Sequence, residues 1–425
     1  MTAHGDSAGR RAELVREILR AGAICPECLG RAFGKLGRGL SNEERGRAIE
    51  TAALALGVQP KSGTCWLCGG AFSEVAVWAE RATEKVRGVE FRTYLFGVRL
   101  SPRLDEMEAY FAERFPTGAI EPAKHAFNRA VGRAFDRLFP GTTVAFVEPD
   151  VSFLIDLPAA TLDVRIGSLF FFGRYRKLVR GIPQTKWPCR RCGGRGCDVC
   201  GGTGKQYPES VEEWVAEPLV DASDAEGARF HGAGREDIDA LMLGEGRPFV
   251  IEIVAPRKRT LDLEALHGEI NRRASARVEV DGLAPVKRRA VEDVKETRVG
   301  KRYRARVEFA EDVTADALEK ALGFLVGTIT QRTPRRVAHR RADKVRMRKL
   351  LETTGAMVDR RTAEIEVATE GGLYVKELVS GDDGRTEPSL AGRLGVDARV
   401  TELDVVEIMW PRRPDGSVDI PHPLP

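Results

Sequence analysis

The most telling stretch of this chain is His231-Gly-Ala-Gly-Arg-Glu-Asp-Ile-Asp-Ala-Leu-Met-Leu-Gly-Glu-Gly-Arg-Pro-Phe249. It places an Arg-x-Asp triplet in a turn flanked by glycines, directly before the apolar run Phe249–Val254. Glycines allow positive φ and let the backbone pass close to a ligand. An aspartate held beside the cations Arg235 and Arg247 would stay ionised and could act as a nucleophile. The alternative interpretation is a salt-bridged turn on the surface.

Size and composition describe an ordinary soluble protein built from several domains. A chain of 425 residues is too long for one hydrophobic core. Its 42% hydrophobic and 31% charged content is typical of globular proteins. No apolar run approaches the roughly 20 residues that span a bilayer, and the start of the chain lacks a signal-peptide core. We therefore expect a cytoplasmic protein that makes no membrane contact and is monomeric.

All eight cysteines belong to Cys-x-x-Cys pairs, which indicates metal binding. The pairs are Cys25/Cys28, Cys65/Cys68, Cys189/Cys192 and Cys197/Cys200. In a cytoplasmic chain this pattern favours zinc over disulfides, whereas a thioredoxin-like redox role would need only one pair. Two such pairs close one tetrahedral site, and four thiolates leave no position open for chemistry. We predict one or two structural Zn²⁺ ions. The last two pairs lie in tandem Cys-x-x-Cys-x-Gly-x-Gly units, which resemble the zinc repeats of DnaJ-type chaperones.

Positive charge is local, because the net charge of the whole chain is only +4. One basic cluster is Gly173–Arg180, and a second is Arg332–Lys349, with nine Lys or Arg against a single Asp. Such runs form either a solvated surface or a phosphate-binding surface. The near absence of acidic residues from the second run favours phosphate.

The hydrophobic pattern predicts an α+β, multidomain protein. A zinc module should occupy 1–72 and the tandem cysteine unit 187–207, and two further domains should occupy 73–186 and 208–425. Helices are expected at Glu43–Leu56, Val75–Arg87, Leu104–Phe115, Ala123–Leu138, Leu261–Arg272 and Thr314–Leu325. Strands are expected at Phe91–Leu100, Thr143–Phe146, Val151–Asp156, Thr161–Ile166, Phe249–Val254, Arg277–Val280, Tyr303–Phe309, Ala363–Val367, Gly372–Leu378 and Thr401–Met409. The segment Leu169–Phe172 adds apolar and aromatic residues.

Motifs for nucleotide cofactors are absent from the sequence. There is no Walker loop, no Gly-x-Gly-x-x-Gly after a strand, no Gly-x-Ser-x-Gly elbow and no histidine pair with metal-ligand spacing. We therefore expect chemistry without an organic cofactor.

These residues together resemble the zinc-bearing, THUMP-containing tRNA pseudouridine synthases of archaea and eukaryotes, which modify T-loop uridines. Gly234–Asp239 followed by Leu243–Phe249 is similar to the catalytic motif of that family. Lys301–Ala305 resembles its second motif, and Gly372–Leu378 resembles its third. The resemblance covers nearly the whole chain. It implies a THUMP-like RNA-binding domain over 73–186 and a catalytic domain over 208–425. It also implies that the catalytic domain has a mixed, mainly antiparallel sheet.

The resemblance also implies roles for individual residues. Asp237 aligns with the catalytic aspartate, with Asp239 as the alternative. Tyr303 would pack against the target base, and Lys376 would pair with the aspartate. The implied substrate contacts are Arg235, Arg247, Leu373, Tyr374, Arg174, Arg176, Lys177, Arg335, Arg336, Arg340 and Arg341. The expected reaction converts uridine 55, and possibly uridine 54, of the tRNA T-loop to pseudouridine.

Two other interpretations stay open at the level of sequence. One is another THUMP-type tRNA-modifying enzyme, although the nucleotide loop or methyl-donor pocket that such enzymes need is not visible. The other is a zinc-containing RNA-binding protein without catalytic activity, which would leave the residues after Glu209 unexplained.

Overall fold

The computed structural model describes residues 5–37, 39–118, 120–339 and 342–424. The chain divides into two compact units, residues 1–167 and 168–425. Each unit has its own hydrophobic cores and is described by itself. Within the described ranges, no helix is both long enough and apolar enough to cross a membrane.

The first unit begins with a helical module around four cysteines. Its helices are α1 (Gly5–Ala21), α2 (Pro26–Ala32), α3 (Asn42–Ala55) and the 3-10 turn η1 (Ala71–Glu74). The α3 helix starts at a capping box, in which Ser41 Oγ accepts a hydrogen bond from the Glu44 backbone N–H at 3.2 Å. The helix predicted at Glu43–Leu56 is therefore present.

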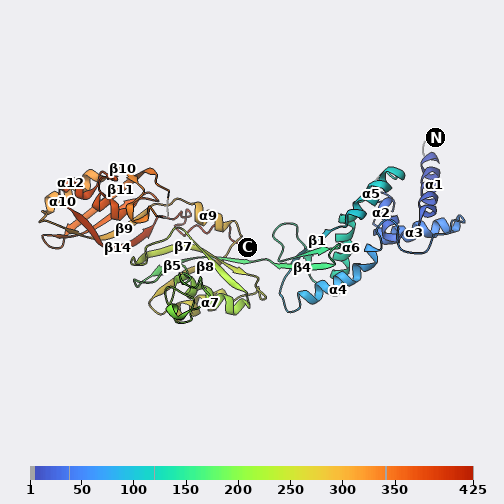
Figure 1. Cartoon of the computed structure of the whole chain (residues 1–425), viewed down its shortest axis with the longest axis horizontal. Coiled ribbons are helices and arrows are strands. Elements are labelled where there is room, and N and C mark those ends of the chain that lie inside the picture. The colour runs from blue at the N-terminus through green and yellow to red at the C-terminus, as the bar shows by residue number, and fades with distance from the viewer. Residues whose placement is uncertain (1–4, 38, 119, 340–341, 425) are drawn as a thin grey trace. The chain divides into compact units, whose positions relative to one another are not determined.

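A four-stranded sheet with the order β2-β1-β3-β4 completes the first unit. Its elements are α4 (Val75–Lys85), β1 (Thr93–Arg99), α5 (Pro102–Arg114), α6 (Ala123–Leu138), β2 (Thr143–Val144), β3 (Val151–Asp156) and β4 (Thr161–Ile166). The strand β1 pairs in parallel with β2 and β3, and β3 pairs antiparallel with β4. Helices α4 and α6 pack on this sheet (Figure 1). Trp78 on α4 and Phe127 on α6 share a hydrophobic core with Phe153 on β3. All the predicted elements of this region are present.

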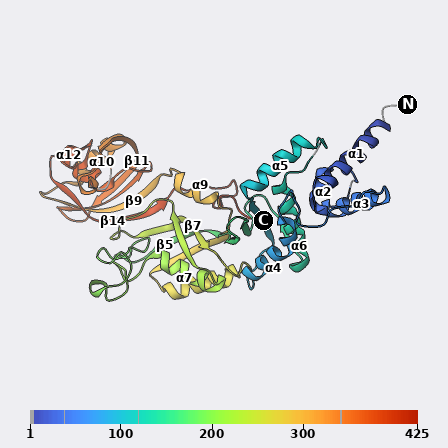
Figure 2. The same ribbon diagram turned by 45° about the vertical axis from the view of Figure 1, so that its right-hand side comes forward.

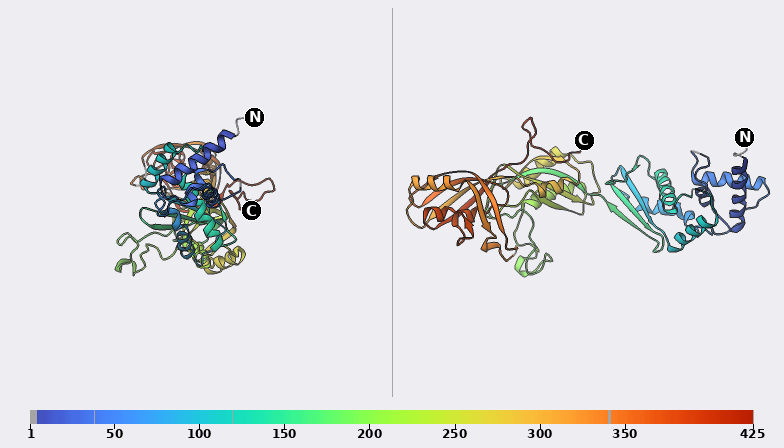
Figure 3. Two further views of the ribbon diagram at one scale, coloured as in Figure 1. Left: turned by 90° about the vertical axis from the view of Figure 1, so that its right-hand side faces the viewer. Right: turned by 90° about the horizontal axis from the view of Figure 1, so that it is seen from above.

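The second unit is built on one large mixed sheet with the order β13-β10-β11-β12-β9-β14-β7-β5-β8, and β6 pairs with β7. Its strands are β5 (Leu169–Lys177), β6 (Gly227–Gly232), β7 (Met242–Val254), β8 (Val278–Pro285), β9 (Lys301–Phe309), β10 (Gly327–Arg332), β11 (Val345–Met357), β12 (Thr362–Thr369), β13 (Thr386–Glu387) and β14 (Ala398–Ile408). Only the β7–β14 pair is parallel. The predicted fold class, α+β with a mainly antiparallel sheet, is confirmed (Figures 2 and 3).

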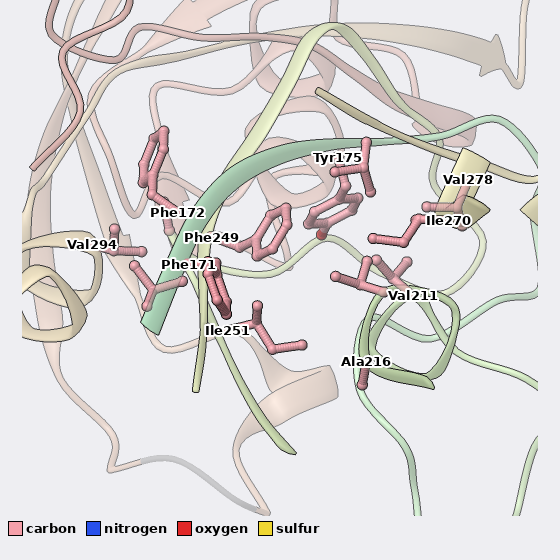
Figure 4. Packing of buried hydrophobic residues seen from close by; sticks show 14 of the residues in the cluster. Phe171, Phe172, Tyr175, Val211, Ala216, Phe249, Ile251, Ile270, Val278 and Val294 are labelled. Carbon is pink, nitrogen blue, oxygen red and sulfur yellow. The ribbon is translucent and has the colours of Figure 1, made fainter. Parts of the chain in front are cut away.

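Helices of the second unit pack against the sheet, and the buried residues form two separate hydrophobic cores, one on each half of the sheet. The helices of this unit are η2 (Asp198–Cys200), α7 (Val211–Ser223), α8 (Leu263–Ala274), α9 (Ala290–Glu296), α10 (Ala315–Leu325), η3 (Arg335–Val337), α11 (Val375–Ser380) and α12 (Leu390–Leu394). One core lies around Phe249 on β7 and the other around Ile365 on β12. Figure 4 shows the first core, where Tyr175 on β5 lies beside Phe249, with their ring centroids 6.2 Å apart. Tyr303 on β9 packs against both cores and marks the seam between them.

Three features of the second unit differ from the sequence prediction. The boundary predicted at 186 grouped β5 with the RNA-binding domain, whereas β5 pairs with β7 and β8 inside the large sheet. The strand predicted at Gly372–Leu378 is wrong: this segment is a turn that leads into α11. Its alternating apolar residues fit either structure, and packing of Val375 and Leu378 into the second core selects the helix. Strands β6, β10 and β11 were not predicted.

Candidate active site

The Arg-x-Asp motif lies in a loop between β6 and β7, which we call the Asp237 loop (residues 233–241). Gly234 has φ of +79°, a conformation that side chains rarely adopt. A Cβ on Gly234 would also lie 3.2 Å from Lys301 Nζ and 3.3 Å from Arg247 Nη1. The glycine thus lets the loop pass directly over two cations.

Glu236 anchors this loop from below, because its side chain is almost fully buried. Arg247 Nε donates to its carboxylate at 2.8 Å, and Tyr175 Oη donates to the same carboxylate at 2.8 Å. Gln184 Nε2 donates both to Tyr175 Oη, at 2.8 Å, and to the Gly234 carbonyl, at 2.9 Å. Burial and the neighbouring Glu236 charge raise the pKa of Tyr175, so this tyrosine stays neutral and donates.

Lys177 fixes the other end of the loop. Its buried ammonium donates to the carbonyls of Ile182 at 2.9 Å, and of Asp237 and Ile238 at 3.1 Å each. Burial lowers its pKa, and Glu236 opposes that shift. The backbone on both sides of the Asp237 side chain is therefore held by buried groups, while the side chain itself points away from them.

The Asp237 carboxylate lies between two cations that come from distant parts of the chain. Lys376 Nζ on α11 is 3.4 Å from Asp237 Oδ2, and Arg336 Nη1 on η3 is 3.6 Å from the same oxygen. Lys376 Nζ also lies 3.3 Å from Asp239 Oδ2. The Asp239 side chain is 69% exposed against 41% for Asp237, so Asp237 is the more enclosed of the two.

A cavity of about 340 Å³ opens beside Asp237, in the size range of small-ligand pockets. Asp237 lines this cavity, whereas Asp239 does not. The other side chains that line it include Arg235, Glu236, Arg247, Lys301, Tyr303, Arg336, Arg346, Arg348, Leu373, Tyr374 and Lys376. Sequence segments up to about 140 positions apart thus converge on one cavity at the seam between the two cores.

Tyr303 and Lys301 are two residues apart on β9, so their side chains face the same side of the sheet, toward this cavity. Burial raises the pKa of Tyr303, which Arg247 lowers and Asp237 raises. Tyr303 is therefore a neutral phenol near pH 7. Burial and the nearby Arg247 together lower the pKa of Lys301 to about 8, although Glu236 opposes this shift.

Helix α11, which carries Lys376, is held in place by the buried side-chain amide of Gln331 and by Arg336. Gln331 Nε2 on β10 donates to the Tyr374 carbonyl at 2.9 Å, and the Tyr374 N–H donates to Gln331 Oε1 at 2.9 Å. Arg336 also donates to Glu377 Oε1 at 2.7 Å. These contacts fix the start of α11, and therefore Lys376, relative to Asp237.

Several residues predicted to contact substrate have other surroundings. Arg247 pairs with Glu236 rather than Asp237, and Arg235 is exposed with its guanidinium 5.7 Å from the Trp187 ring centroid. The buried Arg174 pairs with Glu245 at 2.9 Å, and the buried Lys177 binds backbone carbonyls. The other members of the predicted set are Arg176, which pairs with Glu279; Arg335, which pairs with Asp383; and Arg340 and Arg341, which lie outside the described residues.

Several residues that line the cavity were not predicted from the sequence. Glu236 stood inside the quoted motif but gave no signal of burial. Lys301 stood inside the second motif, and Arg346 and Arg348 lay in the basic segment Arg332–Lys349. Their alternation along β11 could have indicated a strand that presents both arginines on one face.

The cysteines form two separate groups, each able to hold a metal ion. Cys25, Cys28, Cys65 and Cys68 make the first group, and Cys189, Cys192, Cys197 and Cys200 make the second. Four thiolates about 2.3 Å from one tetrahedral ion lie about 3.8 Å apart. The Sγ–Sγ distances of 3.9 Å for Cys25–Cys68, 3.9 Å for Cys192–Cys200 and 3.7 Å for Cys197–Cys200 fit that geometry.

Backbone amides support the second cysteine group in a way that suits thiolates. The N–H groups of Gly196 and Gly204 donate to Cys192 Sγ and Cys200 Sγ, each at 3.2 Å. Such donors stabilise the negative charge of metal-bound sulfur. The glycines of the tandem units therefore serve the metal site directly.

Comparison with known proteins agrees with this architecture. Residues 170–409 match the family model described as "Pus10, C-terminal", and residues 78–156 match "Pus10 THUMP domain, archaeal". A relative from Halorubrum lacusprofundi named tRNA pseudouridine synthase Pus10 is 50% identical over 93% of this chain and 96% of its own. Another of that name, from Methanothrix thermoacetophila, is 46% identical over 92% of this chain and 93% of its own.

Among solved structures, a Cbf5–Nop10–Gar1 complex aligns with a TM-score of 0.32 and 17% identity, over 56% of this chain and 48% of that chain. That likeness is too weak to add to the argument. The two domain matches and the full-length relatives are sufficient, and with them the chain belongs to the Pus10 family of tRNA pseudouridine synthases.

Proposed function

We propose that this protein binds tRNA and converts uridine 55, and also uridine 54, of the T-loop to pseudouridine, with Asp237 as the attacking group. The observation that carries the proposal is the position of Asp237. It is the aspartate of the Arg-x-Asp motif that lines the cavity, and it is held between Lys376 and Arg336. Two cations at this distance attract the carboxylate and hold it at the cavity.

The reaction needs only the groups that surround this cavity. The uridine must leave its stack in the RNA to reach Asp237, at an energetic cost that RNA contacts offset. Asp237 then either bonds to C1′ of the ribose or promotes loss of the C2′ proton to give a glycal. The base turns and rejoins C1′ through C5. On the glycal route C2′ also takes back the proton that it lost. The C5 proton is lost and N1 gains one, so the reaction is an isomerisation with no external reactant.

Tyr303 and Leu373 are the groups best placed to hold the base. Both line the cavity, Tyr303 from β9 and Leu373 from the turn before α11, and a flat base fits against an aromatic ring. The neutral Tyr303 hydroxyl can donate a hydrogen bond to the base or relay the C5 proton. Arg336, Arg346 and Arg348 lie at the same cavity and supply positive charge for the flanking phosphates.

Zinc is the metal that we propose for the two cysteine groups. Tetrahedral sets of four thiolates are typical of structural zinc, and they leave no coordination position for substrate. Bound zinc would supply cross-links to its own part of the fold. The cysteines of the first group would hold the helical module together, and those of the second would hold the loop 187–207.

Site-resolved pseudouridine mapping of an unmodified tRNA transcript tests the proposed target. We expect pseudouridine at uridine 55 and at uridine 54 after incubation with the metal-loaded protein. Transcripts with cytidine at position 54 or 55 should each lose only the signal at the substituted position. Pseudouridine elsewhere with none in the T-loop would contradict the target, and tight tRNA binding without any pseudouridine would contradict the activity.

A further inference from the structure

Beneath the Asp237 loop lies a cluster of buried charge that the reaction described above does not use. Its single carboxylate is Glu236, and the cations nearest to that carboxylate are Arg247 at 2.8 Å and Lys177 at 3.9 Å. Lys301 adds a third cation, with its Nζ lying under Gly234 next to Arg247. Three positive groups thus surround one negative group, and the cluster carries an excess of buried positive charge.

The three cations differ in how their donors are satisfied. Arg247 donates to Glu236 and to the Ala233 carbonyl, and Lys177 donates to three backbone carbonyls. The Lys301 ammonium has no hydrogen bond or ion pair within residues 5–37, 39–118, 120–339 and 342–424, although the side chain is half-buried and lines the cavity. A desolvated ammonium is costly unless an acceptor or an anion compensates it. Such an acceptor has to come from the cavity.

The position of Lys301 on β9 indicates which part of a bound uridine would lie near its ammonium. It is two residues from Tyr303 and on the same face of the strand, at the inner end of the cavity beside Gly234. Asp237 lies on the Lys376 and Arg336 side of the same cavity. A uridine whose C1′ approaches Asp237 and whose base lies against Tyr303 would direct a base carbonyl oxygen toward Lys301.

We propose that Lys301 binds a carbonyl oxygen of the flipped uracil and stabilises the negative charge that the base acquires when its glycosidic bond breaks. This inference rests on the proposed function. When the C1′–N1 bond breaks, its electron pair leaves with the base, and the charge spreads from N1 onto the O2 and O4 oxygens. The electron deficiency at C1′ is met by the Asp237 carboxylate or by loss of the C2′ proton.

The charge then disappears as the reaction finishes. On the acylal route C5 of the base donates an electron pair to C1′, and the pair of the Asp237–C1′ bond returns to the carboxylate. On the glycal route C5 bonds to C1′ while C2′ takes back the proton that it lost. The C5 proton leaves and N1 takes up one proton. Lys301 keeps its proton throughout, and its stabilising contact is strongest while the base is detached. An interaction that strengthens in this way lowers the barrier, as a donor aimed at a developing oxyanion does.

Single-turnover kinetics of Lys301→Met on an unmodified tRNA transcript test the proposal. We expect the rate constant to fall by about 100-fold or more, the range for removal of one oxyanion donor. The dissociation constant for tRNA should stay within threefold, because the contact matters after the base is detached. Lys320→Met, a change of an exposed lysine on α10, is the matched control and should leave both quantities unchanged.

Stability separates this role from a structural one. Lys301 is an uncompensated, half-buried cation, so Lys301→Met should keep or raise the thermal midpoint of unfolding while it lowers the rate. A structural lysine would give the opposite result, with a lower midpoint and a rate that falls only in proportion to the folded fraction. A rate within threefold of wild type would overturn the proposal. Wild-type protein that makes no pseudouridine would instead overturn the proposed function.

Sulfur substitution in the substrate identifies the contact itself. Transcripts with 2-thiouridine or 4-thiouridine at the target position replace one carbonyl oxygen with a much poorer acceptor. One of the two should slow the wild-type protein about tenfold and have little further effect on Lys301→Met, as expected for two changes that remove the same interaction. Equal sulfur effects in both proteins would show that Lys301 does not bind either oxygen.

Discussion

Glu236 and Asp237 are neighbours in the chain, yet their side chains have opposite surroundings. Glu236 points into the protein and binds Arg247 and Tyr175, while Asp237 points to the cavity and lies near Lys376 and Arg336. The motif pointed to Asp237, and the family resemblance gave Lys376 as its partner, which lies 3.4 Å away. The other two cations expected beside it have different neighbours, because Arg247 pairs with Glu236 and Arg235 lies over Trp187. Partners distant in sequence, such as Arg336, become visible only when the sheet brings β10 and the Asp237 loop together.

Glu236→Gln should destabilise the second unit more than an ordinary loss of an ion pair. The change leaves Arg247 and Lys177 buried without a counter-charge, which typically costs about 3–5 kcal/mol of unfolding free energy. Urea denaturation measures this loss. The matched control is Glu308→Gln, which breaks an ion pair with Arg399 in which both side chains are exposed and should cost less than about 1 kcal/mol. Equal losses in the two variants would contradict the buried role of Glu236.

Lys301 should give the protein a measurable pH dependence. Its pKa is about 8 in the folded protein against 10.5 ordinarily, so the unfolded chain binds more protons between these values. The cost of the buried ammonium is therefore fully present below pH 8 and disappears as the pH rises toward 10.5. Wild type should gain unfolding free energy relative to Lys301→Met between pH 7.5 and pH 10. A difference that stays constant over this range would show that the pKa is not lowered.

At the scale of elements, many of the long helices and strands were predicted, whereas β6, β10, β11 and the short active-site helix α11 were not. Helix α6, with its long apolar stripe, was predicted over Ala123–Leu138 and has those bounds. Helix α11 has only six residues, and its alternating pattern fits a strand equally well. Contact with β10 and the second core decides its structure, and no local signal in Gly372–Leu378 carries that information.

Gln331→Leu tests how much the placement of α11 matters. The change removes both hydrogen bonds to Tyr374 and keeps a side chain of similar size. We expect the single-turnover rate to fall about tenfold, because a shift of about 1 Å in a positioned group is costly to catalysis. The tRNA dissociation constant should change little. Gln206→Leu, in the loop after the second cysteine group, is a control at a half-buried glutamine outside the cavity lining. A normal rate in Gln331→Leu would show that Lys376 does not depend on this contact.

At the scale of the whole molecule, each of the two units contains one group of four cysteines. The first group belongs to a hydrophobic core, where Cys28 is fully buried beside Leu29 and Phe111. The second group holds a loop that starts and ends at the bridge between Pro188 and Lys205. The sequence predicted the ligands of both groups because Cys-x-x-Cys spacing is local. It did not predict that their structural settings differ.

Loss of metal should therefore affect the two units differently. Cys28→Ser should raise amide hydrogen exchange throughout 15–33 and the surrounding helices, since the core depends on the site. Cys200→Ser should raise exchange only within 187–207 and leave the large sheet protected. Exchange followed by mass spectrometry on metal-loaded protein measures both changes. Cys28→Ser with unchanged exchange would contradict a structural metal in the first unit.

The most direct test of the central claim compares Asp237→Asn with Asp239→Asn in site-resolved pseudouridine mapping of one tRNA transcript. Both aspartates lie near Lys376, but Asp237 alone of the two lines the cavity. The account predicts that Asp237→Asn binds tRNA normally and forms no pseudouridine, while Asp239→Asn still modifies the T-loop. Pseudouridine formed by Asp237→Asn, or its loss only in Asp239→Asn, would contradict the assignment of Asp237.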